Sequence, residues 1–208
     1  AGSILENYDL LSLNPDVKIV GEVKVRIRHN LISKEDVNLK DIITVYSHPQ
    51  ALAQCAEFLK KNNLEPVPYY DTAGAVSNLD QFDKNSAAIG SAEAADIYGM
   101  KIIKEGIETN PNNYTRFFII VREDFMSVEN PTKASFILTV SDEPGALSQC
   151  LSIFSDHNLN MTKLESRPIH GKPWSYRFYI DVQIPEDRNQ YEEALDAIND
   201  KASDFRVL

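Results

Sequence analysis

The sequence predicts two folded parts, an α/β part followed by a smaller α+β part with a ferredoxin-like βαββαβ order. Three observations support this prediction. Short apolar runs alternate with helical patterns as far as Val121. A polar stretch, Asp124–Thr132, then interrupts the pattern. Beyond it the order of elements changes to strand, helix, two strands, helix and strand.

Composition narrows the class of protein. The chain has 208 residues and 43% hydrophobic residues, enough for two ordinary domains with real cores. Its net charge of -10, without a run of Lys or Arg, argues against binding to nucleic acid or to a membrane surface. Cys55 and Cys150 lie among apolar residues, which predicts two buried free thiols in a reducing compartment. A cytoplasmic protein is therefore expected.

The first part opens with an expected helix over Ile4–Leu13. In the following segment, Val17–Leu31, apolar and charged residues alternate strictly from Gly21 onward. A period of two predicts a strand with one buried face and one charged face. The apolar residues of this alternation are Val23, Val25 and Ile27.

The remainder of the first part alternates strands with helices, which predicts an α/β sheet with some parallel pairing. Ligands bind at the loops that follow the strands of such a sheet. The expected strands are Ile42–Tyr46, Leu64–Tyr69, Ser86–Gly90, Met100–Lys104 and Tyr114–Val121. The expected helices begin at Pro49 (with Leu52, Cys55, Ala56 and Leu59 at helical spacing), after Asp71 and at Ala92.

The second part is expected to form one sheet with helices on one face. Its other face and its edges would be free to pair, so dimerisation is expected there. The expected strands are Ala134–Val140, Asn160–Ser166, Tyr176–Ile184 and Phe205–Leu208, and the helices are Pro144–His157 and Tyr191–Ile198.

Several polar residues of the first part stand where strands meet helices. Ser47 ends a strand, so its hydroxyl either caps the next helix or points into a crevice. Gln54 is expected near the start of that helix, and Thr72 would be a cap by default. Thr115 and Arg116 introduce an apolar strand. Taken singly, none of these residues indicates an enzyme.

The second part carries a turn that could receive a carboxylate. Gly145 would let the backbone approach a ligand closely, and the helix that follows offers free N–H groups. Glu165 and Arg167 lie two residues apart at the end of the next strand. They could bind the charged groups of a free amino acid or pair with each other.

Four segments in the same order resemble motifs of prephenate dehydratases that carry a C-terminal ACT regulatory domain. Asn113 followed by Thr115-Arg116-Phe117 resembles the Thr-Arg-Phe signature, and the run from Ser47 to Cys55 resembles a second catalytic motif. The other two, Gly145–Ser148 and Glu165–Pro168, resemble the phenylalanine-binding motifs of the ACT domain.

The resemblance implies a catalytic part with two lobes, similar to periplasmic binding proteins, over residues 1–126. A linker over 127–132 and an ACT domain over 133–208 would follow. It further implies conversion of prephenate to phenylpyruvate in phenylalanine biosynthesis, feedback by phenylalanine, and a homodimer or homotetramer formed through the ACT domains. The sequence has no glycine-rich nucleotide loop and no paired His or Cys ligands. We therefore expect that the protein uses no cofactor and binds no metal.

The resemblance also assigns residues to roles. Thr115, Ser47 and Gln54 would be catalytic, and Thr72, Arg116 and Ser3 would bind substrate. Phenylalanine would contact Gly145, Ala146, Leu147, Ser148, Asn160, Glu165, Ser166, Arg167 and Pro168.

The chain departs from the family pattern at its start. Relatives carry an upstream segment with a catalytic Asn that is not in this sequence, so we expect a fragment with an incomplete cleft. Two interpretations stay open. The parent protein is a prephenate dehydratase, or this chain acts only as a dimerising module that binds phenylalanine.

Overall fold

The computed structural model describes residues 4–122 and 128–208. The chain divides into two compact units, one formed by Lys24–Phe117 and the other by the segment ending at Val23 together with Phe118–Leu208. The two units are defined by which segments contact each other, so they do not test the predicted domain boundaries at 126 and 133. Those boundaries stay a prediction. Across the described ranges, every helix is too short or too polar to span a bilayer.

The first unit contains a five-stranded mixed sheet. Its strand order is β4-β3-β5-β2-β6. β3 pairs in parallel with β4 and with β5, whereas β2 pairs antiparallel with β5 and with β6. The predicted sheet with some parallel pairing is thus confirmed. The strands are β2 (Asn30–Ser33), β3 (Thr44–Ser47), β4 (Glu65–Pro68), β5 (Ser86–Gly90) and β6 (Lys101–Lys104).

Helices cover both faces of this sheet. On one face, Leu52 and Leu59 pack into a core that includes Val45 of β3. On the other face, Val76 packs with Ala94 around Ile32 and Ala88. The small alanines let these short helices approach the strands closely. The helices are α2 (Pro49–Gln54), α3 (Ala56–Lys61), α4 (Thr72–Ser77) and α5 (Ala92–Ile97), with 3₁₀ turns η1 (Leu39–Asp41) and η2 (Leu79–Gln81).

The helix expected after Pro49 is interrupted at Cys55, which separates α2 from α3. At this break the backbone carbonyl of Gln54 accepts a hydrogen bond from the Thr109 amide at 2.8 Å. Gln54 is therefore the last residue of α2, and its expected position near a helix start is wrong. The helix ends where Gln54 contacts Thr109, a residue far away in the sequence, and helical periodicity does not encode such a contact.

β1 (Val17–Arg26) and β7 (Tyr114–Arg122) form a separate two-stranded sheet. The alternation in β1 predicted one buried face, and this prediction is wrong. Val23 is 47% exposed and Val25 is 43% exposed. A strand buries one face only when a further layer packs on it, and these two side chains have no such layer among the described residues.

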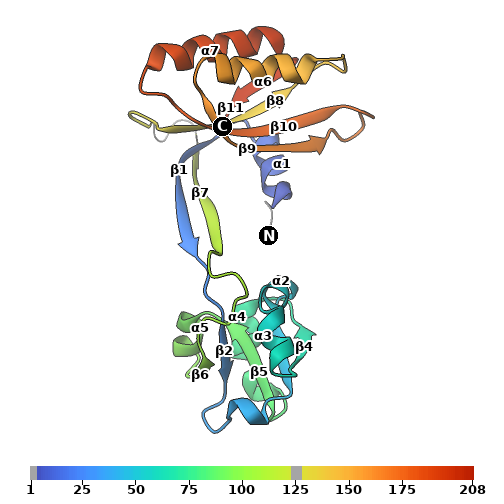
Figure 1. The fold of residues 1–208 in the computed structure, drawn as a ribbon, viewed down its shortest axis with the longest axis vertical. Helices are drawn as coiled ribbons and strands as arrows, with labels where there is room; N and C mark the ends of the chain where they lie inside the picture. The colour runs from blue at the N-terminus through green and yellow to red at the C-terminus, as the bar shows by residue number, and fades with distance from the viewer. Residues whose placement is uncertain (1–3, 123–127) are drawn as a thin grey trace. The chain divides into compact units, whose positions relative to one another are not determined.

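The second unit has the predicted ferredoxin-like arrangement (Figure 1). Its four strands are antiparallel in the order β11-β8-β10-β9, so β9 and β11 are the sheet edges. Phe136, Phe154 and Ile180 lie in the core between this sheet and its two long helices. The elements are β8 (Lys133–Thr139), α6 (Ala146–Asp156), β9 (Asn160–Pro168), β10 (Tyr176–Gln183), α7 (Arg188–Lys201) and β11 (Asp204–Val207).

The opposite face of that sheet carries α1 (Leu5–Leu13), as Figure 1 shows. Tyr8 and Leu11 of α1 are buried in a cluster with Ile137, Tyr179 and Leu208. The Tyr8 and Tyr179 rings lie 5.0 Å apart between centroids. The expectation that this face is free for pairing is therefore wrong, because the sequence does not show that a helix of the same chain docks on it.

Candidate functional site

Ser47 ends β3 at the carboxyl edge of the parallel strands. Its side chain is fully buried, and its hydroxyl donates a hydrogen bond to the Ile89 carbonyl of β5 at 2.7 Å. The cap of α2 is His48, whose Nδ1 accepts from the Gln50 amide. Ser47 therefore neither caps the helix nor has a free hydroxyl proton. It joins two strand ends beside the loops where ligands bind in such sheets.

Thr72 is the first residue of α4 and lies at the same edge of the sheet. The cap of this helix is Asp71, whose carboxylate accepts from the Gly74 amide. Gly90 ends β5 beneath α4, and a Cβ there would lie only 2.7 Å from the Val76 side chain. Glycine is required at this close approach, which brings the backbone of Thr72 against the strand end.

Gln54 lies in a cluster of three polar side chains. Its Oε1 is 2.7 Å from His29 Nε2 and accepts a second hydrogen bond from Asn113 Nδ2 at 3.0 Å. His29 is only 6% exposed, between β1 and β2. The contact with Asn113 brings the motif of residues 47–55 beside the segment that carries Thr115. We call His29, Gln54 and Asn113 the amide cluster.

The amide cluster borders an open depression of about 480 Å³. Gln54 lines this depression, whereas Ser47, Thr72, Thr115 and Arg116 are not among its lining residues. Two carboxylates, Glu57 and Glu108, also line the depression, which makes it unfavourable for an anion. The other lining residues are Ala53, Ala56, Thr109, Asn110, Asn112, Asn113 and Tyr114.

Thr115 and Arg116 are half-buried residues near the start of β7. Within the described part of the chain, the Thr115 hydroxyl has no hydrogen-bond partner, unlike that of Ser47. A half-buried hydroxyl without a protein partner is available to a ligand. Ser3, the remaining predicted substrate-binding residue, lies outside the described residues.

The first predicted effector motif lies in the turn before α6. Gly145 adopts a left-handed conformation, with φ of +88°, and has no side chain to cap the helix. Ser148 donates its hydroxyl hydrogen bond back to the Gly145 carbonyl at 2.9 Å. Ala146 and Leu147 are half-buried, whereas Ser148 is exposed.

The second predicted effector motif lies on β9, at one edge of the sheet. Asn160 donates to Gln183 at 2.8 Å at the start of this strand. Glu165 and Arg167 are half-buried, whereas Ser166 and Pro168 between and after them are exposed. Glu165 lies 3.6 Å from Lys163, so Glu165 and Arg167 each have another charged neighbour.

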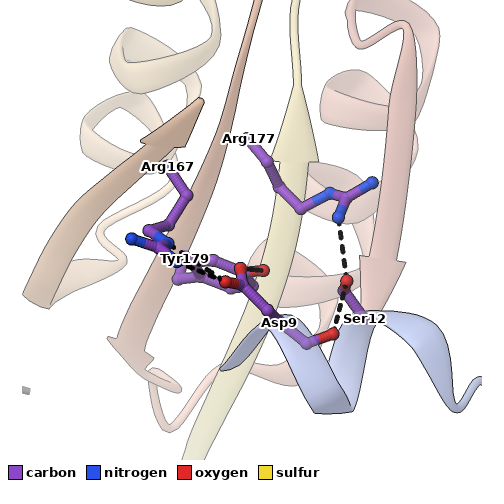
Figure 2. Close-up of polar contacts among 5 residues, drawn as sticks. All are labelled: Asp9, Ser12, Arg167, Arg177 and Tyr179. Carbon is purple, nitrogen blue, oxygen red and sulfur yellow. Dashed lines mark hydrogen bonds and ion pairs between the residues drawn. The ribbon is translucent and has the colours of Figure 1, made fainter. Parts of the chain in front are cut away.

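Arg167 forms an ion pair with Asp9 of α1, as Figure 2 shows. Both Arg167 Nη2, at 2.6 Å, and Nε, at 3.1 Å, donate to the same carboxylate oxygen. Tyr179 donates to the other oxygen at 3.1 Å, and Arg177 donates to Ser12 at 2.8 Å. We call these five residues the ionic cluster. No sequence pattern points to Asp9, because a lone carboxylate on a short helix is usually solvated.

The Asp9 carboxylate is stabilised in its charged form by these contacts. The hydrogen bond from Arg167 is the main cause that lowers the pKa of Asp9 below its ordinary value of 3.8, and Tyr179 adds to the effect against the opposing effect of burial.

Comparison with known proteins matches both parts of the chain to families. The prephenate dehydratase family model matches residues 1–125, and the ACT domain model matches residues 134–202. A relative from Arabidopsis thaliana, named arogenate dehydratase/prephenate dehydratase 2, chloroplastic, is 38% identical over 100% of this chain and 57% of its own length. The chain spans about half the length of the curated relatives it matches, between 54% and 57%.

Two solved structures are similar over the whole chain. Prephenate dehydratase from Arthrobacter aurescens, in complex with L-Phe, has a TM-score of 0.88 and 28% identity, covering 100% of this chain and 69% of that one. The second structure, described as GqqA, a novel type of quorum quenching acylase, has a TM-score of 0.85 and 30% identity, covering 100% of this chain and 76% of that one. By these matches the chain belongs to the prephenate dehydratase family and continues into an ACT domain.

Proposed function

We propose that the parent protein converts prephenate to phenylpyruvate, and that Thr115 is its central catalytic residue. The half-buried Thr115 hydroxyl without a protein partner is the observation that carries this proposal. It is supported by family membership and by the contact that brings Gln54 beside Asn113, two residues before Thr115.

The reaction needs little from charged catalytic groups. As the ring carboxylate leaves as carbon dioxide, its electron pair enters the ring, the C–O bond breaks and the departing hydroxyl takes a proton to become water. Aromatisation supplies the driving force. The enzyme must orient the ring and provide a proton or a strong hydrogen bond at the hydroxyl. A Thr hydroxyl is a poor acid, so it acts by position and local field.

Prephenate carries two carboxylates, which need cationic or N–H partners. Arg116, half-buried beside Thr115, supplies a guanidinium. The acidic depression beside Gln54 is a poor place for these carboxylates. Ser47 and Thr72 lie at the strand ends, and Ser3 is proposed from resemblance alone. The rest of the anion site would come from the upstream segment that relatives carry.

For the regulatory part, we propose phenylalanine as an allosteric effector. It would bind where two ACT domains pair, with the Gly145–Ser148 turn of one subunit and the Asn160 and Glu165–Pro168 positions of the next. β9 is a sheet edge, so it has backbone groups that a second chain can pair with. A dimer is the smallest assembly that satisfies this site. A cytoplasmic location is part of the proposal, because two buried free thiols fit a reducing compartment.

One assay separates the proposed enzyme from a pure binding module. Phenylpyruvate absorbance would be followed from prephenate, with this chain and with the chain extended by the upstream segment of its relatives. We expect formation of phenylpyruvate by the extended protein. Inactivity of both would contradict the proposed reaction and favour the binding module.

A further inference from the structure

We propose that His29 is a positioning residue that fixes the side-chain amide of Gln54. The proposal rests on the proposed dehydratase function, because it assigns Gln54 to the reacting site. His29 matches none of the four motifs that identified the family. It is the buried histidine at the junction between β1 and β2.

The Gln54 amide has its oxygen, rather than its NH₂ group, toward His29 and Asn113. Its Oε1 accepts from Asn113 Nδ2 at 3.0 Å and lies 2.7 Å from His29 Nε2. Two donors on one carbonyl oxygen satisfy both of its lone pairs. A flipped amide would place the Gln54 NH₂ group against the NH₂ group of Asn113, donor against donor. With the Gln54 and Asn113 amides placed in this way, the 2.7 Å contact requires the hydrogen of the His29 ring on Nε2.

With its oxygen held from two sides, Gln54 presents its NH₂ group as the free end. Within the described part of the chain, this nitrogen has no hydrogen-bond acceptor. Gln54 borders the open depression, so its amide donors are available to a ligand. A donor held in place before the reaction bonds the departing hydroxyl without reorganisation, whereas a rotating amide must first be oriented.

His29 also joins the surrounding segments through its backbone. Its amide donates to Glu108 Oε2 at 3.0 Å, and its carbonyl accepts from the Ile107 amide at 2.9 Å. Two residues after Ile107, the Thr109 amide donates to the Gln54 carbonyl at 2.8 Å. Gln54 is thus held at both its backbone and its side chain. A substitution at His29 removes the hydrogen bond to the Gln54 side chain and leaves these backbone hydrogen bonds in place.

The test uses the protein extended by the upstream segment, with prephenate as substrate. His29→Leu removes the donor at similar size, and we expect kcat to fall on the order of tenfold with little change in KM, since a small misplacement of a reacting group is costly. His29→Gln retains an N–H donor at similar reach and should recover most of the loss. His157→Leu, a histidine of the other unit that contacts the Ile153 carbonyl, is the matched control and should leave kcat unchanged.

Double substitution distinguishes positioning from general structural support. In a Gln54→Ala background, His29→Leu should cost nothing further, because the group it positions is gone. Additive losses would overturn the proposal. If His29→Leu does not fold, Asn113→Ala removes the other donor at a half-buried position, and the same non-additivity with Gln54→Ala is expected.

A spectroscopic reading is independent of turnover. The long-range ¹H–¹⁵N spectrum of the His29 ring in this chain should show the hydrogen on Nε2, and a hydrogen on Nδ1 alone would overturn the proposal. An extended wild-type protein that forms no phenylpyruvate would count against the proposed function instead. The two failures are thus separable.

Discussion

The amide cluster and the ionic cluster both join segments that are far apart in the sequence, but they use different interactions. The amide cluster has an imidazole and two amides, whereas the ionic cluster pairs a carboxylate with a guanidinium. Hydrogen bonds between uncharged groups respond little to salt, whereas a partly exposed ion pair is screened. We therefore expect the amide cluster, at the proposed catalytic site, to keep its contacts as salt rises, and the ion pair beside the proposed effector motif to weaken.

The largest effect is expected at Thr115. Thr115→Val keeps the β-branched shape and removes the hydroxyl, so turnover should fall about 10²–10³-fold, as when one transition-state donor is lost. Phenylpyruvate formation by the extended protein is the measurement. Thr115→Ser retains the hydroxyl and should keep most activity. Near-normal kinetics of Thr115→Val would break the assignment of chemistry to this region.

The docking of α1 should depend mainly on its buried aromatic residue. Tyr8 is 5% exposed, and Tyr8→Ala should destabilise the second unit by about 3 kcal/mol. Each unit contains one buried thiol, so thiol labelling reports on each separately. Burial raises the pKa of Cys150, and burial together with nearby Glu108 raises that of Cys55 to about 12.

We therefore expect Tyr8→Ala to accelerate the labelling of Cys150, with no change at Cys55. Equal rates for Cys150 in the variant and the wild type would show that α1 does not stabilise this sheet. Acceleration at both cysteines would instead show that the two units unfold together, which would break the comparison between them.

The effector turn offers a direct test of the regulatory half. Gly145→Trp should weaken phenylalanine binding at least about tenfold, because a bulky side chain would fill the turn. Calorimetry on this chain is the measurement. Gly171→Trp is the matched control, since Gly171 also has a positive φ, +77°, and open space around it. Unchanged affinity in Gly145→Trp would refute the proposed effector site.

The smallest effect is expected from the ionic cluster itself. Asp9→Asn should reduce stability slightly at neutral pH and low salt, and less at high salt. Because the folded-state pKa of Asp9 is lowered, its contribution is present above the ordinary value of 3.8 and is lost as pH falls through the lower folded value. Urea unfolding of variant and wild type over a pH series downward from 7 would measure this, and a difference that does not shrink as pH falls below 3.8 would contradict the ionic character of the contact.

Local pattern was sufficient for most elements. The strands β8 to β11 and the helices α6 and α7 follow from apolar periodicity, and so do β3 and β5. The same reasoning failed for Val23 and Val25, because alternation shows that a strand has an apolar face but not that anything covers it. It also missed the break at Cys55, which coincides with a hydrogen bond from Thr109.

By itself the sequence determined the family, the order of elements and the positions of the four motifs, since these depend on residue identity and on short spacings. Three features were decided by tertiary structure alone. α1 covers one face of the sheet of the second unit, the Ser47 hydroxyl donates to the Ile89 carbonyl, and Gln54 contacts His29. Asp9 and Arg167 are separated by 158 positions. A contact over such a distance depends on how the whole chain packs, and no local spacing encodes it.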